Sequence, residues 1–204
     1  MTLDELRESD FWSFFNVRET GRSPSGNGLA VTLATGGFAE HIALAVSCDT
    51  AGETGAAGDI SAAVLHLRRS WVTGPPWGIN PLANDITASW LTALVPAADK
   101  ASFTPLVDEI RSLRAGEEFK AKVEDQAWLD SSAGRLAIAY VGVLSEPFAC
   151  RGETTYLTVG QDKHPDGTDW TVFRLRFLSP PAGSVRWCRG GGASRHRSPP
   201  GPVR

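Results

Sequence analysis

Cys48 and His41 are the residues of this sequence that come nearest to a thiol nucleophile and its base. They lie seven positions apart, and the apolar residues Ile42, Leu44 and Val46 alternate between them. That alternation predicts a strand, on which side chains an odd number of residues apart point to opposite faces. A cysteine nucleophile needs a base within hydrogen-bond reach. We therefore interpret Cys48 as a small buried hydrophobic residue, not a catalytic one.

The remaining groups that could do chemistry are scattered along the chain. Cys150 stands beside Arg151, whose charge could lower the pKa of a thiol, but no base can be named for it, so we expect an unreactive thiol. His66 is expected on the solvated side of a helix, and His164 in a charged turn. No two histidines are spaced two or four positions apart, so we expect no bound metal. The common nucleotide-binding motifs are missing too, so no cofactor is expected.

The segment from Arg68 to Asn80 has the composition of a binding loop. Arg68, Arg69 and Trp71 lead into a stretch, VTGPPWGINP, that holds three prolines and Trp77. Tryptophan and arginine dominate binding hot spots, and connections of this length are often functional. We therefore predict a binding surface formed by Arg68, Arg69, Trp71, Trp77 and Asn80. The alternative is that Trp77 packs onto the core and the prolines only direct the chain.

The N-terminal part of the chain is predicted to form a helix and then a β-hairpin. Thr2 and Glu5 have the spacing of a capping box, so a helix is expected to begin there. The cluster FWSFF at 11–15 is strongly apolar and must dock on another part of the molecule. The composition of 21–28 (GRSPSGNG) is that of a loop. Two segments of alternating apolar residues then predict the strands of a hairpin: 29–34 and 42–48.

Helical periodicity is followed by a change to period two in the rest of the chain. Apolar residues three and four positions apart predict three helices: 59–71, 85–95, and one that has Thr104 as its N-cap and ends at Gly116. Alternating or continuous apolar residues then predict four strands: 119–123, 136–144, 154–159 and 170–178. The second of these strands is apolar on both sides, which is typical of a strand in the centre of a sheet.

Runs of strands beside runs of helices are typical of the α+β class. We predict an antiparallel sheet of about six strands, made of the N-terminal hairpin and a C-terminal four-strand meander, with three or four helices packed on one face. Residues 1–178 are predicted to form a single globular domain. Residues 179–204 are rich in Pro, Gly and Arg and hold few apolar residues, so we expect a disordered basic tail.

Charge is divided unevenly along the chain. Residues 1–178 hold 15 Lys and Arg against 23 Asp and Glu, a net charge of −8, whereas 179–204 hold five arginines and no acid. An acidic body disfavours nucleic acid as a partner, but it can steer association with a basic protein.

The N-terminus lacks the order of a signal peptide, and the longest apolar run is too short to span a membrane. Three widely spaced cysteines favour free thiols. We therefore expect a soluble, cytoplasmic protein.

Our leading hypothesis from the sequence is a non-enzymatic binding or regulatory protein that recognises another protein. A small enzyme of hydrolase or transferase type with a dispersed active site is one alternative, and a carrier of a small apolar ligand is another. An enzyme should bring His, Cys or acidic side chains together in a pocket, and a carrier should hold a large apolar cavity. A protein binder should instead expose an apolar or acidic patch.

Overall fold

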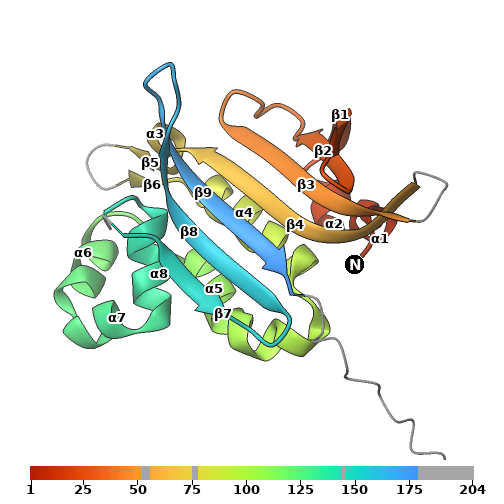
Figure 1. The fold of residues 1–204 in the computed structure, drawn as a ribbon. Helices are drawn as coiled ribbons and strands as arrows, with labels where there is room; N and C mark the ends of the chain where they lie inside the picture. The colour runs from red at the N-terminus through yellow and green to blue at the C-terminus, as the bar shows by residue number, and fades with distance from the viewer. Residues whose placement is uncertain (52–55, 75–77, 144–145, 179–204) are drawn as a thin grey trace, which may run out of the picture.

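Hydrogen bonding between seven antiparallel strands organises the chain (Figure 1). The structure is a computed structural model, and it describes residues 1–51, 56–74, 78–143 and 146–178. The strand order across the sheet is β1-β2-β3-β4-β9-β8-β7, so β4 and β9 join an N-terminal and a C-terminal meander. The strands are β1 (Arg18–Ser25), β2 (Gly28–Ala34), β3 (Ile42–Ala51), β4 (Ala56–Arg68), β7 (Phe148–Arg151), β8 (Thr155–Lys163) and β9 (Asp169–Phe177).

Helices and a small second sheet make up the rest of the described chain. The strands β5 (Thr73–Gly74) and β6 (Gly78–Ile79) pair with each other, apart from the large sheet. The 3-10 helix η2 (Ala97–Asp99) precedes the helix α5. The helices are α1 (Leu3–Arg7), α2 (Asp10–Phe14), α3 (Arg69–Val72), α4 (Pro81–Leu94), α5 (Lys100–Ser112), α6 (Glu117–Glu124), α7 (Gln126–Asp130) and α8 (Ser132–Tyr140).

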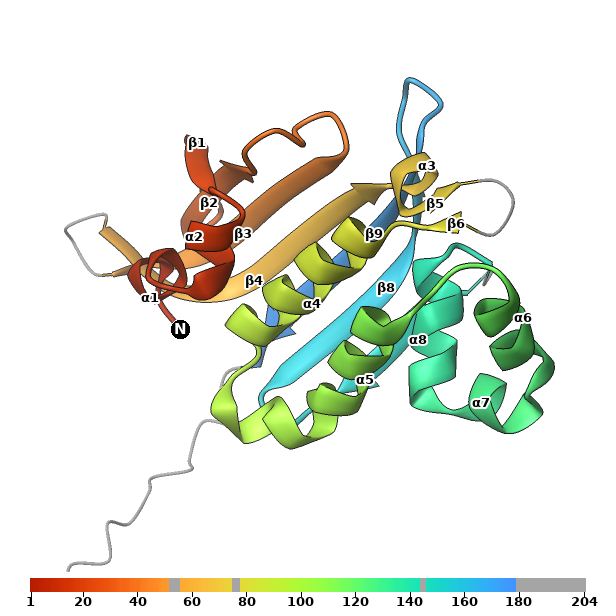
Figure 2. The same ribbon diagram turned by 180° about the vertical axis from the view of Figure 1, so that it is seen from behind.

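One face of the sheet is covered by α4 and α5, as Figure 2 shows. The strand residues that point to this face are almost fully buried, among them Val46, Leu65 and Phe173. Trp90 of α4 is 2% exposed and its ring meets the edge of Phe173 with centroids 6.4 Å apart. The core therefore lies between α4 and the central strands, and the Trp90 ring fills part of that space.

The opposite face of the sheet is the one turned to the viewer in Figure 1, where no helix of the described chain covers the strands. Residues that alternate with the core positions lie on it, and several of those on β3 and β4 are small or half-buried. Ala43 pairs across to His66, and Ala45 to Val64. His66 therefore lies on a strand and on this face, where its ring is near Trp170 of β9, with centroids 6.3 Å apart.

The predicted α+β class, the antiparallel sheet and the N-terminal hairpin are confirmed. The hairpin is β2 and β3, and the C-terminal meander is present as β7, β8 and β9. The sheet has seven strands instead of about six. Part of the difference is β1, which covers most of the segment predicted to be a loop, because its backbone pairs with β2 despite a polar, glycine-containing sequence.

The helix predicted over 59–71 is wrong for 59–68, which belong to the long central strand β4, whereas 69–71 lie in the short helix α3. Ala63, Leu65 and Leu67 are fully buried, whereas Val64 and His66 between them lie on the other face and are only partly buried. Ladders to β3 and β9 satisfy the backbone of β4 on both sides. A short segment with apolar residues at many positions fits both the helical period of 3.6 and the strand period of two. Pairing with the neighbouring strands decides in favour of the strand.

Two of the four predicted C-terminal strands are also wrong, because 119–123 lies in α6 and 136–140 lies in α8. The Ser131 hydroxyl accepts a hydrogen bond from the Gly134 N–H at 3.0 Å and caps α8. From Leu136 to Tyr140 every residue of α8 is buried, since the helix lies between α5 and β8. A helix buried on all sides has the same continuous apolar sequence as a central strand.

The predicted helices over 85–95 and near Thr104 are present, but both begin earlier. Asn80 caps α4 and Pro81 occupies its first turn. The start of α5 is Lys100, so Thr104 is not its N-cap, and the Thr104 hydroxyl instead donates to the Lys100 carbonyl at 2.7 Å. The predicted tail, 179–204, lies outside the described residues. Within the described part of the chain, no helix is long and apolar enough to span a lipid bilayer.

Candidate functional site

A broad hollow between α2 and α4 brings together aromatic and acidic side chains. Its volume is about 600 Å³. Both helices lie on the covered face of the sheet (Figure 2). We call it the aromatic hollow, and it is lined by Asp10, Phe11, Ser13, Phe14, Phe15, Asp85 and Ser89.

Phe14 is the most exposed apolar residue of the aromatic hollow. Its side chain is 79% exposed, whereas Phe11 and Phe15 are 2% and 5% exposed and belong to the core. The Phe14 ring stands edge-on to Phe15, with centroids 4.9 Å apart. Because α2 is only five residues long, its inner side docks Phe11 and Phe15 while Phe14 is left in water. An exposed aromatic side chain of this size is available for contact with another molecule.

Local caps at both ends of α2 set the direction of this segment. The Ser9 hydroxyl accepts a hydrogen bond from the Trp12 N–H at 3.3 Å and caps the start of the helix. After the helix, Asn16 has a φ of 47°, a left-handed conformation that asparagine tolerates better than most residues. The chain then turns into β1, and the Gly36 N–H donates to the Phe15 carbonyl at 3.1 Å. The position of Phe14 is therefore fixed from two sides.

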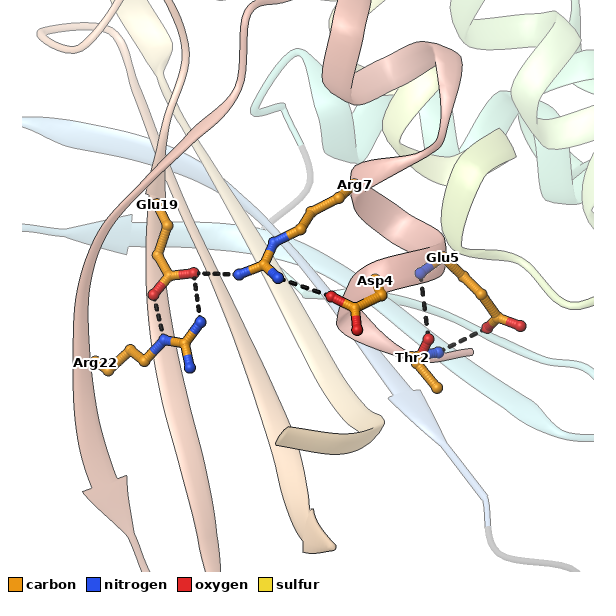
Figure 3. Close-up of polar contacts among 6 residues, drawn as sticks. All are labelled: Thr2, Asp4, Glu5, Arg7, Glu19 and Arg22. Carbon is orange, nitrogen blue, oxygen red and sulfur yellow. Dashed lines mark hydrogen bonds and ion pairs between the residues drawn. The ribbon is translucent and has the colours of Figure 1, made fainter. Parts of the chain in front are cut away.

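An ionic clamp holds α1 against β1 and so supports the same region (Figure 3). The Arg7 guanidinium donates to Asp4 and to Glu19 at 2.7 Å each. Arg22 donates to both oxygens of Glu19, once at 2.9 Å. The hydrogen bonds from Arg22 and then Arg7 outweigh the effect of burial and lower the pKa of Glu19 to about 2. Glu19 is therefore ionised at neutral pH and joins one helix to one strand.

The first turn of α1 is tied to the sheet as well. Thr2 and Glu5 form the predicted capping box, which Figure 3 also shows: the Glu5 N–H donates to the Thr2 hydroxyl and the Thr2 N–H to the Glu5 carboxylate. The Met1 carbonyl accepts from the Ile60 N–H of β4 at 2.8 Å. The helix α1, which directly precedes α2, is thus anchored to both β1 and β4.

The charges at the rim of the aromatic hollow are both negative. Asp10 begins α2 and Asp85 lies in the first half of α4, and both are exposed. Among residues in the described ranges, no Lys, Arg or His forms an ion pair with either carboxylate. An aromatic ring beside two unpaired carboxylates can bind a cationic side chain through ion pairs and through cation–π attraction.

Two of the residues predicted to form a binding surface make contacts within the chain. The Trp71 ring stacks on His41, with centroids 5.4 Å apart and planes within 10°, and it also packs against the core. Asn80 accepts a hydrogen bond from the Leu82 N–H at 3.0 Å as the N-cap of α4. Trp77 lies outside the described residues. That this segment binds a partner stays a prediction.

The other two predicted residues, Arg68 and Arg69, lie side by side at the end of β4. They line a polar hollow of about 320 Å³. We call this hollow the arginine corner, and its lining residues are Arg68, Arg69, Ser70, Thr73, Thr168 and Asp169. The structure thus brings both arginines together with the β8–β9 hairpin, a neighbour that the sequence did not suggest.

The structure keeps Cys48 and His41 apart, as predicted. Cys48 is 1% exposed, on the core face, and burial raises the pKa of its thiol. The His41 ring is stacked on Trp71 and its Nε2 atom is 3.5 Å from the Glu40 carboxylate. Burial raises the pKa of Cys150 as well, so the neighbouring Arg151 does not activate that thiol.

The aromatic hollow was only half visible in the sequence. The cluster at 11–15 was expected to dock, and Phe11 and Phe15 do so. Nothing in the local pattern separates Phe14 from these two, and nothing places Asp85 beside it, because α4 follows almost 70 residues later. A prediction that the helix ends at Phe14 would have helped, because a five-residue helix buries only one of its sides and leaves a residue on the other side exposed.

Comparison with known proteins identifies no relative of this chain. No family model matches the chain, and no curated protein or solved structure is significantly similar to it.

Proposed function

We propose that this chain is a non-enzymatic protein that recognises another protein, and that the aromatic hollow receives a basic segment of that partner. The observation that carries the proposal is Phe14, which is 79% exposed in a hollow whose lining also holds two carboxylates without a cationic partner among the described residues. A soluble domain that keeps such a ring in water loses the free energy that its burial would contribute, which binding can recover.

The chemistry of the hollow favours lysine or arginine on the partner. A cation placed over the Phe14 ring gains attraction from the aromatic face, and Asp10 and Asp85 of the same hollow add opposite charge. The apolar stem of the same side chain can cover the ring. An acidic partner would meet two like charges at the rim and would be disfavoured by them.

The overall charge of the domain supports the same choice. Residues 1–178 carry a net charge of −8, which attracts a basic partner over distances near the Debye length of about 8 Å at physiological salt. The hollow would then hold the partner once it arrives, because hot spots are formed by aromatic anchors in partly enclosed positions.

Synthetic peptides can test the proposal before a partner is identified. We would measure fluorescence anisotropy with a labelled peptide of alternating Lys, Arg and Leu, and with a matched peptide in which Glu replaces each basic residue. The basic peptide is expected to bind the full chain, and Phe14→Ala to weaken it about tenfold or more. Asp10→Asn combined with Asp85→Asn should weaken it and reduce its salt dependence.

Controls at exposed sites away from the hollow separate local from general effects. Val123→Ala removes another exposed apolar side chain, and Asp130→Asn removes another exposed carboxylate, so neither should change peptide affinity. Equal binding of the acidic peptide, or an affinity unchanged by Phe14→Ala, would reject the proposed function.

A further inference from the structure

The arginine corner opens beside a second, apolar hollow, and the two share Arg69 and Thr73 as walls. The second hollow has a volume of about 180 Å³, and its apolar lining includes Ile79, Phe119 and Val141. A charged hollow thus adjoins an apolar one across the two residues that they share. From this juxtaposition we propose that the corner binds a small aliphatic carboxylate, with its head at Arg68 and Arg69 and its tail in the apolar hollow.

Arg69 is held in place without an acidic partner. A Cβ atom built on Gly142 would lie 2.6 Å from the Arg69 Nε atom and 2.9 Å from its Cζ atom, so the guanidinium packs against bare backbone. Gly142 has a φ of 80°, which glycine adopts without strain. Within the described ranges no carboxylate forms an ion pair with Arg69. A positioned, half-buried and unpaired guanidinium is suited to a planar carboxylate, which it can bind through two parallel hydrogen bonds.

The charge of the arginine corner selects a single negative charge. Arg68 and Arg69 contribute two positive charges and Asp169 one negative charge, so the lining carries a net charge of +1. A carboxylate balances this charge, whereas a phosphate monoester with nearly two negative charges would leave an excess beside Asp169. The charge of Arg68 also extends to Asp166, where it helps to lower the pKa after the hydrogen bonds from Thr168. Arg69 is therefore the main anion-binding group.

The hydroxyl groups of the corner are mostly engaged already. Thr73 donates to the Arg69 carbonyl at 3.2 Å, and Thr168 donates to Asp166 at 2.5 Å while accepting from the Trp170 indole at 2.9 Å. Ser70 is the third hydroxyl and is exposed at the start of α3. It is the remaining donor that can turn toward a carboxylate oxygen.

The apolar hollow favours a ligand that carries an apolar tail on its carboxylate. Ile79 and Val141, which are 7% and 5% exposed, line the hollow together with Val143, which is 61% exposed. Each methylene that enters such a surface strengthens binding about fourfold until the space is filled. A short chain of about five carbons is therefore expected to bind more tightly than acetate.

Calorimetric titration of the full chain with hexanoate tests the site directly. Hexanoate should bind, and acetate and hexan-1-ol, which each lack one half of the ligand, should bind at least about tenfold more weakly. Arg69→Gln should abolish measurable binding, and Asp169→Asn should tighten it several-fold because it removes the opposing charge. Arg111→Gln, at an exposed arginine of α5, is the matched control and should leave the affinity unchanged.

Several results would overturn the proposal. Absence of hexanoate binding at about 10 mM would do so. Equal affinity for acetate and hexanoate would show that the apolar hollow does not bind the tail. An unchanged affinity for hexanoate in an Arg69→Gln variant that circular dichroism shows to be folded would exclude Arg69 as the residue that binds the carboxylate. Tighter binding of hexyl phosphate would contradict the charge argument, and tighter binding of N-acetylleucine would assign the site to the C-terminus of a peptide instead.

Discussion

The carboxylate of Asp99 accepts two hydrogen bonds from Thr154, one from its backbone N–H at 3.0 Å and one from its hydroxyl at 2.8 Å. The Glu153 N–H donates to the same carboxylate. Asp99 is 1% exposed and ends η2 just before α5, whereas Thr154 lies in the turn between β7 and β8. Across 55 residues, this contact fastens the start of a covering helix to the edge of the sheet.

Replacing Asp99 by Asn should destabilise the domain. Burial by itself would raise the pKa of Asp99, but its hydrogen bonds outweigh burial and lower the pKa below the ordinary value, so the residue is ionised when folded. An amide in its place accepts more weakly and turns an N–H group toward other donors. We expect a loss of about 1–3 kcal/mol in the free energy of unfolding, measured by urea denaturation.

Asp108→Asn is the control for the Asp99 substitution. Its side chain is 64% exposed on α5 and, within the described ranges, forms an ion pair with Arg111 alone, at 3.9 Å, so the expected change is within about 0.5 kcal/mol. If the two variants unfold at the same urea concentration, the Asp99–Thr154 contact does not contribute to stability.

The clamp at Glu19 predicts a dependence of stability on pH. The folded pKa is about 2 and the ordinary value is 4.5, so the ionised clamp stabilises the fold above about pH 4.5 and loses this contribution as the pH falls toward 2. Since the side chain is 23% exposed, solvent screening limits the contribution to about 1 kcal/mol. Glu19→Gln should therefore be less stable than the natural chain at neutral pH.

Urea midpoints measured across this pH range test the Glu19 prediction. The difference between the natural chain and Glu19→Gln should shrink toward zero near pH 2, where the carboxylate of the natural chain becomes protonated. A difference that stays constant from neutral to acidic pH would mean that packing, not ionisation, explains the effect.

His66 is expected to stay neutral at neutral pH. Burial and then the charge of Arg174 lower the pKa of His66, while the carboxylate of Asp162, which is paired with Arg174, acts in the opposite direction. Arg174→Gln removes the positive charge and frees that carboxylate, so the pKa of His66 should rise. An NMR titration of the imidazole protons measures it directly. Arg176→Gln, two residues along the same face of β9, should shift the pKa much less.

The sequence predicted the fold where local signals and tertiary contacts agree. The capping box at Thr2 and the hairpin of β2 and β3 both rest on neighbours close in the chain. The helix predicted over the β4 segment failed because its central position depends on β9, which follows about 100 residues later. Burial on every side likewise made α8 resemble a strand.

The candidate sites were less predictable than the fold because each combines distant segments. The aromatic hollow needs Phe14 from α2 and Asp85 from α4, and the arginine corner needs Asp169 from β9 beside Arg69 from α3. Sequence composition identified both arginines, since their residue type alone suggests binding. It could not find the apolar hollow next to them, whose lining comes from β6, α6 and the end of α8.

The Cys48 thiol should react slowly in the folded protein. It is 1% exposed, and burial raises its pKa, so both access and the fraction of reactive thiolate are low. Mass spectrometry after iodoacetamide treatment should find Cys48 largely unmodified under native conditions at neutral pH and fully modified in denaturant. Rapid native labelling would contradict the buried position and reopen the possibility of a catalytic thiol.

Phe11 and Phe14 should respond in opposite ways to truncation, although they lie on the same short helix. Phe11 is 2% exposed, so Phe11→Ala should leave a cavity in the core and cost about 3–5 kcal/mol of unfolding free energy. Phe14 is 79% exposed and mainly touches the edge of Phe15, so Phe14→Ala should cost less than about 1 kcal/mol. Urea denaturation of both variants gives the comparison. A large loss for Phe14→Ala would show that its ring packs within the domain, and any loss of peptide binding in that variant would then reflect unfolding. A small loss of unfolding free energy would mean that the Phe14 ring contributes little to the stability of the fold and is free to contact a partner.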